Sequence, residues 1–225
     1  MITVLFLISF QLGERLEYTA KYGVLSIGTM VLEVSDTMTC GNQPCYHIVS
    51  RLTSSSKLGF IFTLNDTIQV CTTLDSLLPV WYEERLHEGK YHNQEALFFD
   101  QQNHSVTYDD TLNLETMENT RDLLSFWYYL RTVPLQEGDT IIVNVHKSKQ
   151  TSAIECLVLA PEKIKTGLGS FSAIRVAPQT QGKGIFGKKG SMEIWYANDS
   201  SRYPVQIKTR FKYGSIIFKL KNVEP

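Results

Sequence analysis

Alternation of apolar and polar residues with a period of two is the feature that most limits how this chain can fold. Such a period places every second side chain on one face of an extended strand, so each alternating run is expected to be a half-buried β-strand. The clearest runs are Leu16-Tyr18-Ala20, Met30-Leu32-Val34, Ile141-Val143-Val145, Ile154-Cys156-Val158 and Ile216-Phe218-Leu220. About a dozen such runs, separated by turn residues, predict an all-β fold built from one large, curled antiparallel sheet, either barrel-like or a half-barrel.

One segment, residues 122–131, departs from this alternation and has the spacing of a helix. Its apolar positions at helical spacing are Leu123, Phe126, Trp127 and Leu130. Asp122 can cap the helix by accepting a backbone N–H, and Pro134 is expected to end it. Because burying this much aromatic surface is favourable at about 25 cal/mol per Å², we expect one short aromatic helix packed against the inside of the curled sheet.

The concave face of such a sheet must be covered, and large barrels otherwise enclose ligand cavities. The helix can fill this space as part of the core, or it can act as a lid over a cavity for a lipid or another apolar molecule. In the second case the candidate ligand-binding residues are Phe126, Trp127, Tyr128 and Tyr129. The sequence leaves both alternatives open.

Residues 1–13 read as an apolar, signal-like segment ahead of a single β domain over residues 14–225. The run is shorter than the roughly 20 residues that span a bilayer, and it matches the apolar centre of a secretory signal, although no Lys or Arg precedes it. A first buried strand is the alternative. We favour export to the periplasm or envelope, and no other segment has the character of a transmembrane span.

Four cysteines allow three pairings. Cys40 and Cys45 flank a turn sequence, so a disulfide across a hairpin is the candidate pairing, and an exported protein would permit it. Cys71 and Cys156 lie within apolar runs, where a free cysteine behaves as a small core residue.

No cofactor, metal or catalytic motif is found. Residues 182–188 spell GxxxxGK, but Lys189 stands where a phosphate-binding loop needs Ser or Thr, and a strand rather than a helix is expected to follow. His87 and His92 can meet across a hairpin, which is half of a metal site. The net charge of −1, without a clustered basic run, disfavours nucleic-acid binding. Because no nucleophile motif is present, a non-catalytic role is expected.

Two segments resemble the bacterial domain of unknown function (DUF) 3108 family. The first is the helix and its exit, with Asp122, Ser125, the Tyr129-Leu130-Arg131 run, Pro134-Leu135 and Gly138. The second is the C-terminal region, with Ile194-Trp195, Asp199, Arg202, Pro204-Val205 and Gly214-Ser215. The start at Gly13-Glu14-Arg15 also fits, so the resemblance covers nearly the whole chain.

The resemblance implies an exported protein of the Gram-negative envelope and does not imply a reaction. Two functional hypotheses follow for such a curled sheet. It can be a binding module for an apolar or amphiphilic ligand on its concave face, or an interaction module that docks an envelope protein partner through its edge strands or loops. A hydrolase is the third and weakest alternative.

Overall fold

The computed structural model describes residues 9–40, 43–55, 63–179 and 190–225. The predictions for residues 1–8 of the signal-like segment, for the turn at 41–42 and for the 182–189 loop therefore lie outside the described residues. The strands are β1 (Arg15–Tyr22), β2 (Leu25–Cys40), β3 (Gln43–Ser54), β4 (Asn65–Thr73), β5 (Pro79–Glu88), β6 (Tyr91–Asp100), β7 (Ser105–Tyr108), β8 (Leu112–Glu115), β9 (Thr140–Lys147), β10 (Gln150–Thr166), β11 (Gly169–Gln179), β12 (Ser191–Ala197), β13 (Pro204–Phe211) and β14 (Gly214–Glu224).

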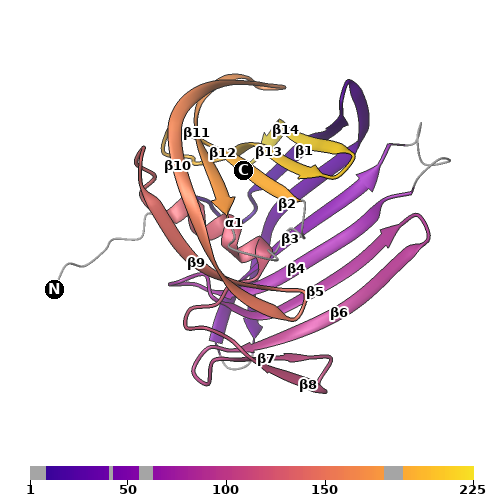
Figure 1. The fold of residues 1–225 in the computed structure, drawn as a ribbon, viewed down its shortest axis with the longest axis vertical. Helices are drawn as coiled ribbons and strands as arrows, with labels where there is room; N and C mark the ends of the chain where they lie inside the picture. Colours follow the sequence, from indigo (N-terminus) through magenta and orange to yellow (C-terminus); the bar gives the residue numbers. More distant parts are fainter. Residues whose placement is uncertain (1–8, 41–42, 56–62, 180–189) are drawn as a thin grey trace.

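All of these strands belong to one antiparallel sheet, in the order β8-β7-β6-β5-β4-β3-β2-β1-β14-β13-β12-β11-β10-β9. The sheet curls strongly, and its edge strands β8 and β9 do not pair, so it is an open half-barrel (Figure 1). The prediction of an all-β fold with a large curled antiparallel sheet is confirmed.

The alternating pattern sets the register of the sheet. Leu16 and Tyr18 on β1 lie opposite Leu32 and Met30 on β2, and all four side chains are buried on the concave face. A shift by one residue would turn these side chains to solvent, which is why the register is strongly specified. The sheet has 14 strands in the described residues, more than the expected dozen. Two of them, β7 and β8, are only four residues long, too short for alternation to identify them.

The single helix among the described residues is α1 (Leu123–Thr132), as predicted. The Asp122 carboxylate accepts hydrogen bonds from the backbone N–H groups of Leu124 at 2.7 Å and Ser125 at 3.1 Å, which makes Asp122 the N-cap. The helix ends at Val133, whose extended backbone suits a residue that precedes a proline.

The connection between β8 and β9 explains where α1 lies. These strands are the two open edges of the sheet, and the segment that joins them must cross the mouth of the half-barrel. The helix lies inside the curve (Figure 1) and contacts β3, β4 and β9. Its buried apolar side chains are Leu124, Phe126, Tyr128 and Leu130, all of which belong to the main core. The helix therefore fills the concave face.

A buried ion pair fixes the end of the helix. Arg131 donates to the Glu14 carboxylate, with Nη2 to Oε2 at 2.9 Å, and both side chains are almost completely buried. Arg131 also donates to the backbone carbonyls of Ser9 and Ser201. Phe10 packs edge-on against Tyr128 and belongs to the core. Residues 9–13, which the sequence assigned to the signal-like segment, thus include a core residue.

Candidate functional site

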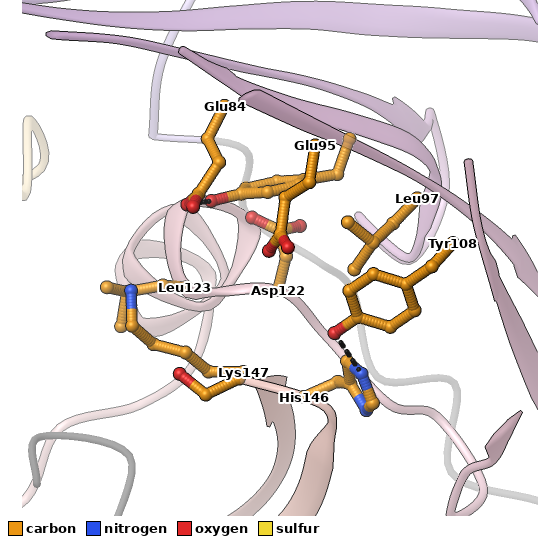
Figure 2. Close-up of a pocket in the computed structure, with 10 residues that line it drawn as sticks. Glu84, Glu95, Leu97, Tyr108, Asp122, Leu123, His146 and Lys147 are labelled. Atoms are coloured by element: carbon orange, nitrogen blue, oxygen red, sulfur yellow. Dashed lines mark hydrogen bonds between the residues drawn. The ribbon is translucent and has the colours of Figure 1, made fainter. Parts of the chain in front are cut away.

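A small pocket lies where the first turn of α1 meets β5, β6, β7 and β9 (Figure 2). Its volume of about 30 Å³ holds one water molecule or one group of similar size. The lining residues are Tyr82, Glu84, Glu95, Leu97, Tyr108, Asp122, Leu123, His146, Lys147 and Ser148. This is a place where the concave face is not completely filled by the helix.

Two glutamates stand directly opposite each other in this pocket. In the β5–β6 ladder Glu84 lies opposite Glu95, and the buried pair Tyr82 and Leu97 lies two residues away along the strands. Side chains two residues apart share a face of the sheet, so both carboxyl groups point inward. Like charges in directly opposite positions destabilise a sheet. Glu84 accepts hydrogen bonds from the Tyr82 hydroxyl at 2.7 Å and from Asn93 Nδ2 at 2.9 Å, and both of these donors are neutral.

The electrostatic environment of the pocket is negative. Burial raises the pKa of Glu95, and the charges of Glu84 and Asp109 raise it further. Burial also raises the pKa of Asp122, against the hydrogen bonds that it accepts at the start of α1. Figure 2 shows the carboxyl groups of Glu84, Glu95 and Asp122 turned toward the same space. Lys147 also lines the pocket, and the charges of Lys147 and Lys149 lower the pKa of Glu95 in part. Among the described residues no Arg or Lys forms a salt bridge with any of these three, so the carboxyl groups outnumber the one lining ammonium group and the pocket can stabilise a further cation.

His146 and Tyr108 form the opposite wall. Burial lowers the pKa of His146 to about 4, so the imidazole is neutral near pH 7. The Tyr108 hydroxyl accepts from the backbone N–H of Lys149 at 3.0 Å and lies 2.8 Å from Nε2 of His146, to which it can donate its proton. Nδ1 of His146 lies 2.8 Å from the Thr151 hydroxyl. Both ring nitrogens are thus engaged by protein groups.

The structure separates the four aromatic residues that the sequence nominated for ligand binding. Phe126 and Tyr128 are buried in the core, whereas Trp127 and Tyr129 are only half-buried. The indole Nε1 of Trp127 is buried and has no hydrogen-bond acceptor in the described part of the chain. Trp127 lies one turn after Leu123, which lines the pocket, so the two side chains lie on the same side of the helix.

Tyr129 lines a second hollow, at the free edge of β9. This groove has a volume of about 230 Å³ and includes Arg121, whose guanidinium lies 3.8 Å from the centre of the Tyr129 ring. Burial lowers the pKa of Arg121 to about 10. A parallel bridge from Arg121 to Val145 covers only the second half of the β9 edge, and Ile142 in the first half is 66% exposed.

The cysteines and the histidine pair were the other predicted sites. All four cysteines are free thiols. Cys40 lies opposite Gln43, and Cys45 lies opposite Met38, so the disulfide stays a prediction. His87 and His92 do meet across the β5–β6 hairpin, with ring centroids 4.0 Å apart. Within the described ranges no group of three His, Cys, Asp or Glu residues is arranged to hold a metal.

Glu84, Glu95, Tyr108 and His146 were not among the site residues predicted from the sequence. A signal was present for the two glutamates, because each occupies an inward position of an alternating strand, two residues from Tyr82 and Leu97 respectively. A charged residue at such a position is unusual unless it is paired. Nothing in the sequence shows that β5, β6 and β9 meet around the start of α1.

These features define a class of protein: an open antiparallel half-barrel that is filled by its own helix and keeps a small acidic pocket beside it. The chain belongs to the DUF3108 family, because the model of that family, described as a protein of unknown function, matches residues 17–221. The predicted family membership is therefore confirmed. No curated protein matches the chain significantly.

One solved structure supports the fold, and two others align more weakly. A β-barrel-like protein of the domain of unknown function DUF1849 from Brucella abortus is similar with a TM-score of 0.62 at 10% identity, over 95% of this chain and 97% of that chain. A candidate lipoprotein from Parabacteroides distasonis aligns with a TM-score of 0.42 at 12% identity, over 99% and 100% of the two chains. A protein described as a candidate exported protein with a YmcC-like fold, from Bacteroides fragilis, has a TM-score of 0.37 at 13% identity, over 96% and 97%. No helix in the described residues is long and apolar enough to cross a membrane.

Proposed function

We propose that this chain is an exported, non-catalytic binding module of the bacterial envelope, and that its concave face accepts an amphiphile with a cationic head group. The opposition of Glu84 and Glu95 at inward positions is the observation that carries this proposal. A sheet gains nothing from two facing carboxylates, and a bound ammonium group would neutralise their repulsion.

The shape of the site limits the ligand. A volume of about 30 Å³ admits a head group of the size of an ammonium ion and excludes an acyl chain. The apolar part of the ligand would lie along Leu123 and Trp127, which are half-buried on one side of α1. Tyr82 and Tyr108 also line the pocket, and the Lys149 ammonium lies 5.7 Å from the centre of the Tyr108 ring, so this ring already attracts a cation.

Two observations support a binding role over an enzymatic one. His146 is neutral, and both of its ring nitrogens have hydrogen-bond partners in the protein, so neither is free to take a proton from a substrate. The sequence also has no nucleophile motif. Export is supported by the apolar first segment. N-terminal sequencing of protein from its native cells tests whether this segment is removed. Cleavage after residue 13 would remove Phe10 from the core.

Calorimetric titration with octylammonium, octyl sulfate and octanol tests the ligand class. We expect the ammonium compound to bind most tightly, and Glu95→Gln to weaken its binding about tenfold, because one charge-assisted contact is lost. The same substitution should raise stability, since it relieves the repulsion from Glu84. Glu137→Gln, at an exposed loop position, is the matched control. Equal binding of the three amphiphiles, or an unchanged affinity in Glu95→Gln, would reject the proposal.

A second candidate function is docking of an envelope protein partner along β9. The observation in its favour is the first half of this edge strand, which pairs with no further strand in the described part of the chain and where Ile142 is 66% exposed beside the groove of Arg121 and Tyr129. An extended peptide can add to such an edge through backbone hydrogen bonds. Ile142→Lys should then abolish capture of the partner from envelope extracts without changing octylammonium binding.

A further inference from the structure

Two neighbouring hairpin turns expose apolar side chains at one end of the sheet. Val24, in the β1–β2 turn, is 95% exposed, and Tyr213, in the β13–β14 turn, is 74% exposed. Leu25, Tyr22 and Phe211 are also exposed. We call these five residues the aromatic turn surface. Large apolar side chains held in water at adjacent turns are unusual in a folded protein and indicate an interaction site.

The two turns form one rigid unit. Strands β1 and β14 are paired, so the turns lie side by side (Figure 1, indigo and yellow). The Tyr22 hydroxyl donates to the backbone carbonyl of Tyr213 at 2.6 Å, and the Tyr22 ring stacks on Phe211 with centroids 6.2 Å apart. A side chain at Gly214 would collide with the Tyr22 ring, so glycine is required for this close contact.

Positive charge surrounds this unit. Residues 18–32 and 204–222 contain six basic residues and no Asp or Glu, although the whole chain has a net charge of −1. The basic residues are Lys21, Lys208, Arg210, Lys212, Lys219 and Lys221. Arg210 pairs with Glu193 and Lys221 pairs with Glu17. Within the described residues the other four form no salt bridge, so most of this charge is available to a partner.

A groove beside the turns gathers part of this charge. It has a volume of about 340 Å³, and its walls include Lys21, Lys165, Lys219 and Lys221. The tip of the β10–β11 hairpin closes one side, since the N–H of Gly167 donates to the carbonyl of Leu220 at 2.9 Å. Lys21 and Lys219 lie on β1 and β14, the paired strands that lead to the two turns, so the groove lies along the same strands as the aromatic turn surface. An anionic phosphate group fits this combination of size and charge.

We propose that the aromatic turn surface docks on a bilayer that contains anionic phospholipids. Aromatic and aliphatic tips enter the interface between head groups and acyl chains, while flanking lysines contact anionic head groups. The lysine groove would hold the phosphate of one lipid. The lysines favour a bilayer over an apolar protein surface as the partner. A bilayer with anionic lipids offers both an apolar layer for the turn side chains and a negative surface for the lysines. This surface is separate from the pocket of Glu84 and Glu95, so either proposal can fail alone.

Sedimentation of the full chain with vesicles tests the proposal. The vesicles are phosphatidylcholine alone and phosphatidylcholine mixed with phosphatidylglycerol. We expect association that requires phosphatidylglycerol and weakens as salt is added. The triple variant Val24→Ser, Leu25→Ser and Tyr213→Ser should lower the partition coefficient at least about tenfold, because the buried apolar contacts are lost. The matched control replaces three exposed apolar residues elsewhere, Tyr91, Leu112 and Ile142, by serine.

Charge is tested in the same way. Replacing Lys21, Lys212 and Lys219 by glutamine should lower partitioning about fivefold for each charge at low salt. The matched control, which makes the same change in net charge, replaces the exposed residues Arg51, Arg85 and Lys90 by glutamine. All variants keep the apolar residues 1–13, so any anchoring by that segment is common to them. Hydrogen exchange gives a local readout, in which vesicles should protect the backbone amides of residues 22–25 and 212–214.

Three results would overturn the proposal. They are no association that depends on phosphatidylglycerol, equal losses in the turn variants and in their controls, or association that leaves the turn amides unprotected. Absence of vesicle binding together with capture of an acidic protein would assign the surface to a protein partner instead. The octylammonium titration contains no vesicles, so its outcome is independent of these results.

Discussion

Replacement of Phe126 by alanine tests whether α1 is the core of the half-barrel or a movable lid. The Phe126 side chain is almost completely buried and packs within the main core cluster. Truncating a buried phenylalanine to alanine costs about 3–5 kcal/mol, because the transfer free energy is lost and a cavity remains. A lid that opens to solvent would lose much less, since its contacts are absent in the open state.

Trp127 gives the comparison on the same helix. Its ring is only half-buried, so Trp127→Ala removes less buried area and should cost about 1–2 kcal/mol. The order of the two effects is informative, because tryptophan is the larger residue and would dominate if both side chains were equally buried. Ile142→Ala, at an exposed position of β9, should leave stability nearly unchanged and is the control.

Urea unfolding followed by far-ultraviolet circular dichroism measures these differences. A large loss for Phe126→Ala with a small loss for Trp127→Ala supports the helix as a filler. Native mass spectrometry of protein purified from its own envelope adds a second readout, in which a filled concave face should carry no two-chain lipid. Small losses for both variants together with a co-purifying lipid would refute the reasoning and restore the lid.

Three further predictions concern charge and redox state. Arg131→Met should destabilise the fold by about 3–5 kcal/mol in chemical denaturation, because it leaves the Glu14 carboxylate buried without its partner. The double variant with Glu14→Leu should recover much of this loss. Burial lowers the pKa of His146 from 6.5 to about 4, so between these pH values the unfolded chain binds a proton that the folded protein does not. The free energy of unfolding should therefore fall by at most about 3 kcal/mol as the pH is lowered from 6.5 to about 4. Urea titrations at each pH measure this loss, with His146→Gln as the reference. Alkylation and mass spectrometry of protein taken from its native cells without reductant should find Cys40 and Cys45 oxidised if the chain is exported.

The sheet and the helix could be predicted because their signals are local. Alternation identifies a strand and its buried face from a few consecutive residues, as in Leu16-Tyr18-Ala20, where all three side chains are buried. The helix start was equally local, since Asp122 caps N–H groups two and three residues later. The curl of the sheet was predicted from the number of strands assigned to a single domain.

The site could not be predicted because its residues meet only through the topology. Glu14 and Arg131 are 117 positions apart, and the ion pair depends on the helix crossing the mouth of the half-barrel. Glu84 and Glu95 face each other because of the register of one hairpin, and His146 joins them only because β9 lies at the opposite edge of the sheet.

The net charge of −1 conceals a separation of charge that links the two proposals. Glu84, Glu95 and Asp122 gather inside the curve, whereas the lysines near β1 and β14 gather at the turns and on the outer side. A uniformly mixed surface would give neither a preference for a cationic head group nor an orientation on an anionic bilayer. If both proposals hold, salt should weaken vesicle docking far more than octylammonium binding, because the turn lysines are exposed to counter-ions and the pocket carboxylates are largely shielded from them. Equal salt sensitivity of vesicle docking and octylammonium binding would mean that the carboxylates are open to solvent in the bound state. That result would contradict a ligand site on the concave face.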